Sequence, residues 1–243
     1  RDRFGRPLAG LVAVWLAARL SWLLGVPLWA LVPLNLLFLL LVAWLMARLL
    51  WAVRQRKNYP VVVILLLLSL AEGQSLAGLV LDDQDWQRRG VLAAVWLVAA
   101  MMTLIGGRVI PFFIQRGLGR PTGVRPIVWL DWALLSGTAL VAMLQAAGLA
   151  VQPSLPVAVL FALLTCGHGV RLLRWFDNAL FREPLLWSLY LAYAWLALAC
   201  AGMALWFAGG LLNASQPLHA LTVGSMAGLI LAMLSRVTLG ADI

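Results

Sequence analysis

Residues 28–52 read LWALVPLNLLFLLLVAWLMARLLWA, a stretch whose only strongly polar side chains are those of Asn35 and Arg48. At about 1.5 Å per residue, an α-helix of this length crosses the roughly 30 Å hydrocarbon core of a bilayer. Comparable apolar stretches recur along the whole chain. Because lipid offers no partner to backbone N–H and C=O groups, each stretch must pair them internally. We therefore predict an all-α, polytopic bundle of about eight transmembrane helices.

The composition agrees with lipid as the main solvent. Of 243 residues, 64% are apolar and only 11% are charged, too few to cover a water-soluble globule of this size. The net charge of +9 accompanies no RNA-binding or helix-turn-helix pattern, so we expect a bilayer rather than a nucleic acid as the partner. No linker divides the chain, and one transmembrane domain spanning 1–243 is the simplest expectation. The two cysteines, Cys166 and Cys200, lie in apolar stretches and are interpreted as core residues.

The connections between the predicted helices alternate in charge. Fifteen of the eighteen basic residues fall on one side, which the positive-inside rule makes cytoplasmic, together with both termini. The longest stretch outside the membrane is a predicted cytoplasmic loop at about 109–125. The helices are predicted near residues 8–25, 28–52, 60–80, 89–108, 126–150, 155–173, 184–211 and 217–237.

Two charged residues lie deep inside predicted helices. Counted from the cytoplasmic edge, Arg19 lies roughly 16 Å deep and Glu72 roughly 18 Å deep. A lone charge at that level is costly, so we hypothesise that Arg19 and Glu72 pair, directly or through one shared partner. The pair is either purely structural, or Arg19 anchors an anionic cofactor group such as a porphyrin propionate. Asp131, one turn inside its helix, is interpreted as a helix–helix contact.

The two histidines are predicted at opposite borders of the bilayer. His168 comes late in a helix that runs inward, and His219 begins the last helix near the outer face. Their levels differ by roughly 20 Å, whereas metal–nitrogen bonds are only about 2 Å long. These two side chains therefore cannot bind the same ion.

The last predicted helix has two regular patterns. Small residues recur every fourth position at Ala220, Gly224, Gly228 and Ala232, a ridge that allows a neighbouring helix or a flat ligand to approach closely. His219, Met226 and Met233 recur every seventh position, and imidazole with thioether suits copper(I) or haem iron. Ordinary helix packing explains the same spacing. If a metal binds here, His219 with a ligand from another helix is the better candidate.

No hydrolase or phosphotransfer motif occurs, so enzymatic activity is unsupported.

Four strings occur in order along the chain: GGRVIPFF at 106–113, GVRLLRW at 169–175, REPLLW at 182–187 and HALTVGSMAGLILAMLSRVTLG at 219–240. Taken together, they resemble the NnrS family of bacterial inner-membrane proteins. The resemblance implies a multi-pass haem- and copper-containing protein of nitric oxide metabolism and nitrosative-stress tolerance. It also implies that several N-terminal helices of the family are absent from this sequence.

The resemblance makes His219 the first ligand candidate, His168 the second, and Arg19 a possible anchor for an anionic group. Leu189 and Tyr190 stand where the family string has LH, and Ala241, Asp242 and Ile243 stand where it continues into HTGR. Tyr190 is either a tyrosinate ligand of ferric iron or an aromatic core residue.

The leading hypothesis is a haem- or copper-binding membrane protein that acts as a redox or metal-handling partner rather than a turnover enzyme. Two alternatives stay open. One is a permease-like transporter with Arg19 and Glu72 along its solute path, and the other is a truncated family member that binds no cofactor. A redox partner or a second chain that supplies further helices is compatible with the first hypothesis.

Overall fold

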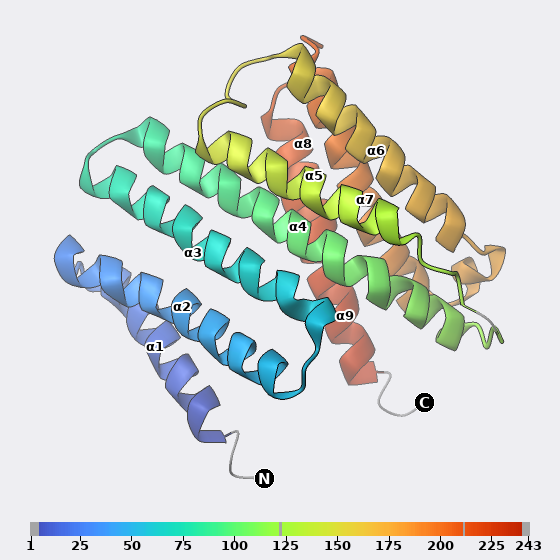
Figure 1. Cartoon of the computed structure of the whole chain (residues 1–243), viewed down its shortest axis with the longest axis horizontal. Helices are drawn as coiled ribbons and strands as arrows, with labels where there is room; N and C mark the ends of the chain where they lie inside the picture. Colours follow the sequence, from blue (N-terminus) through green and yellow to red (C-terminus); the bar gives the residue numbers. More distant parts are fainter. Residues whose placement is uncertain (1–4, 122, 211, 240–243) are drawn as a thin grey trace. The chain divides into compact units, whose positions relative to one another are not determined.

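The computed structural model describes residues 5–121, 123–210 and 212–239, and every regular element within these ranges is helical (Figure 1). The all-α prediction is confirmed. The first half contains α1 (Gly5–Leu23), α2 (Leu28–Ala52), the short 3-10 helix η1 (Arg56–Asn58), α3 (Tyr59–Val80) and α4 (Gln84–Gly117). The second half contains α5 (Val128–Ala146), α6 (Leu155–Trp175), the 3-10 helix η2 (Asn178–Arg182), α7 (Pro184–Phe207), α8 (Ser215–His219), the π-helical turn η3 (Ala220–Ala227) and α9 (Gly228–Leu239).

The structure supports a multi-pass membrane protein. Within the described ranges, seven helices are long and apolar enough to cross a bilayer, and the last of them runs through α8, η3 and α9. The predicted eighth, α1, has a shorter apolar part, Pro7–Leu23. At about 1.5 Å per residue this part falls a few ångströms short of a typical hydrocarbon core. The cytoplasmic location of the termini stays a prediction.

Several predicted helix ends differ from those observed, and two features of the helices were not predicted. α4 continues through Pro111 to Gly117, so the loop expected from about 109 begins only after Gly117. Proline lacks an N–H and removes one helical hydrogen bond, but neighbouring packing in a membrane helix tolerates that loss. The last helix contains the π-helical turn η3, which the sequence pattern did not predict. π-Helical turns inside α-helices frequently occur at functional sites.

The chain separates into two compact units, which are described here one at a time. Unit 1 contains the residues up to Leu97 together with Gln145–Ala147, and unit 2 contains Val98–Leu144 and the residues from Gly148 onward. The expectation of a single domain over 1–243 stays a prediction. In unit 1, α2 packs against both α1 and α3. A Cβ atom on Gly78 would lie 2.4 Å from the Gln87 backbone nitrogen, so α3 and the start of α4 meet at backbone contact.

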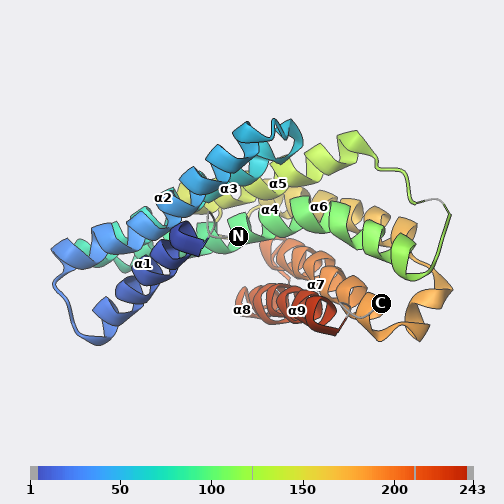
Figure 2. The same cartoon turned by 90° about the horizontal axis from the view of Figure 1, so that it is seen from below.

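In unit 2, α7 packs against α6 on one side and against α8, η3 and α9 on the other (Figure 2). Glycines allow these close approaches. A Cβ atom on Gly224 would lie 2.6 Å from Cγ of Trp195, and one on Gly228 would lie 3.1 Å from Cβ of Ala192. The small-residue ridge of the last helix therefore serves packing against α7 at these two positions.

Candidate functional site

A buried arginine links four helices of unit 2. Arg171, on α6, is only 4% exposed, and its guanidinium donates to three groups on other helices. Nη2 donates to Oδ1 of Asp131 on α5 at 2.5 Å, and Nη1 donates to the Thr103 carbonyl on α4 at 3.0 Å and to the Tyr193 hydroxyl on α7 at 2.8 Å. A Cβ atom on Gly107 would lie 3.0 Å from Nη1, so glycine there leaves room for the guanidinium. The interpretation of Asp131 as a helix–helix contact is confirmed.

His168 extends the same network into the interior. Its side chain is fully buried, and its Nδ1 lies 2.9 Å from the Tyr193 hydroxyl. The Tyr193 hydroxyl oxygen already accepts a hydrogen bond from Arg171. Its own proton is therefore assigned as the donor to Nδ1 of His168. The opposite tautomer would leave both the hydroxyl proton and the Nε2 lone pair of His168 without a partner. His168 is therefore a neutral imidazole that carries its proton on Nε2, and Nε2 has no hydrogen-bond partner among the described groups.

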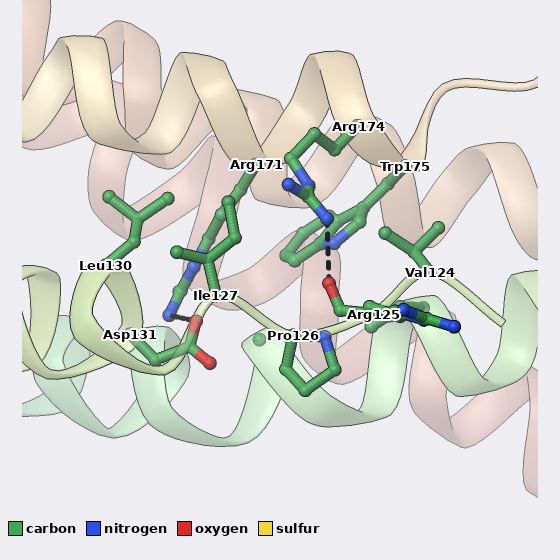
Figure 3. Close-up of a pocket in the computed structure, with 11 residues that line it drawn as sticks. Val124, Arg125, Pro126, Ile127, Leu130, Asp131, Arg171, Arg174 and Trp175 are labelled. Atoms are coloured by element: carbon green, nitrogen blue, oxygen red, sulfur yellow. Dashed lines mark hydrogen bonds and ion pairs between the residues drawn. The ribbon is translucent and has the colours of Figure 1, made fainter.

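A small polar cavity adjoins the network at the end of α6 (Figure 3). Its volume is about 40 Å³. Asp131 and Arg171 contribute to its wall, and Arg174 closes another part by donating from Nη2 to the Arg125 carbonyl at 2.8 Å. This cavity was not predicted from the sequence. The spacing of Arg171 and Arg174 could have indicated a basic site, because residues three apart lie on one helix face.

His219 has the opposite environment from His168. It is exposed at the end of α8, where η3 begins, and its Nδ1 lies 2.8 Å from the Ser215 carbonyl oxygen. A carbonyl can only accept, so Nδ1 carries the proton and the lone pair of Nε2 is directed elsewhere. Metal-ligating histidines commonly have this arrangement, in which one ring N–H is held by a backbone carbonyl.

The structure separates the two histidines. His168 comes 13 residues after the start of α6, roughly 20 Å along that helix, whereas His219 is four residues into the last helix, roughly 6 Å along it. The two helices start at the same end of unit 2 (Figure 1). One side chain is buried in a hydrogen-bond network and the other faces outward, which agrees with the prediction that they do not share an ion.

The free Nε2 of His219 can supply the one protein ligand that a haem iron needs. In the part of the chain that the structure describes, no group of three or more His, Cys, Asp or Glu side chains is placed to hold a metal ion. His168 presents a buried N–H rather than a lone pair. The Tyr190 hydroxyl donates to the Leu172 carbonyl at 3.0 Å, which favours its role as a core residue.

The charged residues predicted to pair both belong to unit 1. Arg19 lies on the exposed face of α1, and Glu72 lies on α3 with its Oε2 buried. The charge of Arg19 acts on Glu72, but the two described side chains form no ion pair within 4.0 Å, and Oε2 has no hydrogen-bond partner among the groups described. Pairing of Arg19 with Glu72 stays a prediction.

A second, exposed ion pair lies among the loops of unit 2. Arg120, after α4, donates to Oδ2 of Asp177, after α6, at 2.6 Å from Nη2. The pKa of Asp177 is lowered, mainly by the hydrogen bond from the Ala179 backbone N–H and to a smaller extent by the hydrogen bond from Arg120. This pair joins the two basic connections that the sequence places on one side of the membrane.

Comparison with known families agrees with the resemblance found in the sequence. A family model described as NnrS protein matches residues 2–241, nearly the whole chain and both of its units. No curated protein and no solved structure matches the chain. The chain is therefore a member of the NnrS family.

Proposed function

We propose that this protein binds haem in the bacterial inner membrane and acts in nitric oxide metabolism and nitrosative-stress tolerance. It would do so as a redox or metal-handling partner rather than as a turnover enzyme. Membership of the NnrS family supports the assignment. Haem, when bound, would supply an iron centre suited to electron transfer or to binding a small diatomic molecule. Copper, which the family resemblance also implies, would need ligands beyond those of the described residues.

The geometry of His219 is the observation that carries the proposal. The 2.8 Å hydrogen bond to the Ser215 carbonyl holds the ring in one tautomer and leaves Nε2 as a lone-pair donor on an exposed surface. Val223, one turn along η3, is 64% exposed, so the surface that follows His219 is apolar and open. A flat apolar macrocycle could lie against such a surface with its iron on His219.

His168 and Arg19, the other two residues predicted to contact haem, have weaker support as contacts. His168 would need its Nε2 proton removed and its surroundings opened before it could ligate a metal, because the side chain is fully buried. Arg19 is exposed, so its guanidinium is accessible to an anionic group such as a propionate. We retain His219 as the axial ligand, Arg19 as a possible anchor and His168 as a second candidate.

The test is a visible spectrum together with an iron and copper analysis of the purified chain in detergent. His219→Ala should abolish the Soret band and the bound iron, and haem added together with imidazole should restore both, because imidazole takes the empty ligand position. The control is Leu173→Ala, which truncates an exposed apolar side chain on α6 outside the proposed haem surface and should leave the spectrum unchanged. Equal iron and equal spectra in both variants would refute His219 as the ligand.

A colourless and metal-free protein would favour one of the two alternatives. An uptake assay in reconstituted vesicles then separates them. Solute accumulation that depends on Arg19 and Glu72 indicates a permease-like transporter. Its absence indicates a family member that folds without binding a cofactor.

A further inference from the structure

The proposed function does not use the polar cavity at the end of α6. Arg171 forms part of its wall and has hydrogen-bonding capacity to spare. A guanidinium has five N–H donors, and the contacts of Arg171 use both hydrogens of Nη1 and one of Nη2. The remaining Nη2 hydrogen has no acceptor among the described groups, and Arg171 contributes to the cavity wall. A nearly buried N–H without an acceptor is unfavourable, so an acceptor in the cavity that reaches Nη2 would be stabilising.

The charges around the cavity favour an anion as that acceptor. The carboxylate of Asp131 is already paired with Arg171, which leaves the charges of Arg125 and Arg174 without a balancing carboxylate in the cavity wall. Figure 3 shows the Arg174 guanidinium above the cavity and that of Arg125 directed away from Asp131. The guanidinium of Arg174 therefore remains as the unbalanced positive charge over the cavity.

The place and the size of the cavity restrict the ligand further. The wall consists of α4 around Gly107 and Pro111, the segment before α5 with its first turn, and the last turns of α6, at the end of the helices that the sequence predicts to be cytoplasmic. A volume of about 40 Å³ exceeds the roughly 10–15 Å³ that a cavity needs to hold one water, but it is too small for a large ligand. Part of a tetrahedral oxyanion can enter such a space, and the rest would remain outside at the level of the lipid headgroups. Arginine is well suited to this, because its planar N–H groups match phosphate oxygens in pairs.

We propose that this cavity binds a phosphate-type oxyanion, with two oxygens directed toward Arg171 and Arg174. The phosphate comes either from the headgroup of an anionic lipid or from the aqueous phase. Basic pockets between transmembrane helices on the cytoplasmic side are known to bind anionic headgroups in other proteins. This site lies in unit 2 among α4, α5 and α6 and is independent of His219.

The experiment compares Arg174→Gln with Arg182→Gln, each in the full chain. Both changes remove one positive charge, but Arg182 lies in η2, is exposed and does not line the cavity. The first arm measures phosphatidylglycerol and phosphatidylcholine retained on the detergent-purified protein by native mass spectrometry. The second arm measures thermal stabilisation by inorganic phosphate against chloride at equal ionic strength.

We expect the intact chain to prefer phosphatidylglycerol and Arg174→Gln to weaken that preference about tenfold, as loss of one charge-assisted hydrogen bond implies. Arg182→Gln should retain it. Stabilisation by inorganic phosphate that is lost in Arg174→Gln supports the same site with a free ligand. If Arg174→Gln does not fold, Arg174→Lys keeps the charge but removes the paired N–H groups of the guanidinium, and it should show the same loss in smaller measure. Indistinguishable behaviour of the cavity variant and Arg182→Gln in both arms would mean that the cavity holds water only, which overturns the proposal.

Discussion

Arg171 in unit 2 and Glu72 in unit 1 are both ionisable side chains within apolar helices, and their surroundings differ sharply. Arg171 is nearly inaccessible and has a carboxylate, a carbonyl and a hydroxyl as partners on three other helices. Glu72 is half-buried, and its Oε2 has no hydrogen-bond partner in the described ranges. Arg171 is therefore held by hydrogen bonds to other helices of its unit, whereas Oε2 of Glu72 has no such partner in the described ranges.

The comparison shows that depth alone does not select partners inside a membrane protein. Arg19 and Glu72 are predicted at the same depth, but their described side chains form no ion pair within 4.0 Å, whereas those of Arg171 and Asp131 do. In a medium of low polarity, a charge needs partners at hydrogen-bonding distance to offset the cost of leaving water. Which face of each helix meets its neighbour therefore decides whether a buried charge stabilises the fold.

The largest expected effect is the loss of Arg171. Arg171→Met should lower the free energy of unfolding by about 3 kcal/mol, chiefly because the Thr103 carbonyl and the Tyr193 hydroxyl would lose a buried donor, while Asp131, whose side chain is 36% exposed, would keep a partly solvated charge. Thermal or denaturant unfolding of the detergent-solubilised protein measures the change. In the double variant Arg171→Met with Asp131→Asn, part of the loss should be recovered. A double variant as unstable as the sum of the single variants would show that the two side chains do not interact.

A smaller effect is expected from the hydroxyl that joins the arginine to the histidine. Tyr193→Phe should cost about 1–3 kcal/mol, because Nδ1 of His168 would lose its donor inside the protein. The matched control is Tyr190→Phe, since that hydroxyl is less buried and has one backbone carbonyl as its partner. Unfolding measured under identical conditions should separate the two variants. Equal stability of both would contradict the assigned role of Tyr193.

The smallest effect is expected in unit 1. Glu72→Gln should change the free energy of unfolding by less than about 1 kcal/mol, because the carboxylate has no close ionic partner to lose. The charge-swapped variant, Arg19→Glu with Glu72→Arg, should be no more stable than either single change. If the swap restores stability that the single changes remove, Arg19 and Glu72 pair directly, as the sequence hypothesis requires. The contrast between the two units would then disappear.

Much of the architecture was predictable, because lipid imposes strict rules on length and polarity. The boundaries of α2 and α3 follow from where charged or turn-forming residues interrupt the apolar stretches, and they were predicted to within a residue. The course of α4 through Pro111 and the π-helical turn η3 were not predictable in this way. Both depend on how neighbouring helices accommodate irregular backbone, which no local pattern contains.

The candidate site was also predictable only in part, because its residues follow from local sequence and their hydrogen bonds from helix packing. His219 was identifiable from its string and its place at the start of the last helix, but its hydrogen bond to the Ser215 carbonyl appears only in the structure. For His168, only the structure shows that the side chain is fully buried and that its Nδ1 accepts a hydrogen bond from the Tyr193 hydroxyl. Its place as the second ligand candidate stays a prediction.

By itself, the sequence determined the solvent, most of the helices and the family, since these follow from hydrophobic length and local strings. The distribution of arginines predicts the orientation in the membrane. Only the tertiary structure decided which polar groups meet. Arg171 reaches Thr103, Asp131 and Tyr193, which lie 68, 40 and 22 residues away along the chain. Such contacts depend on the rotation and spacing of packed helices, and one-dimensional periodicity specifies neither.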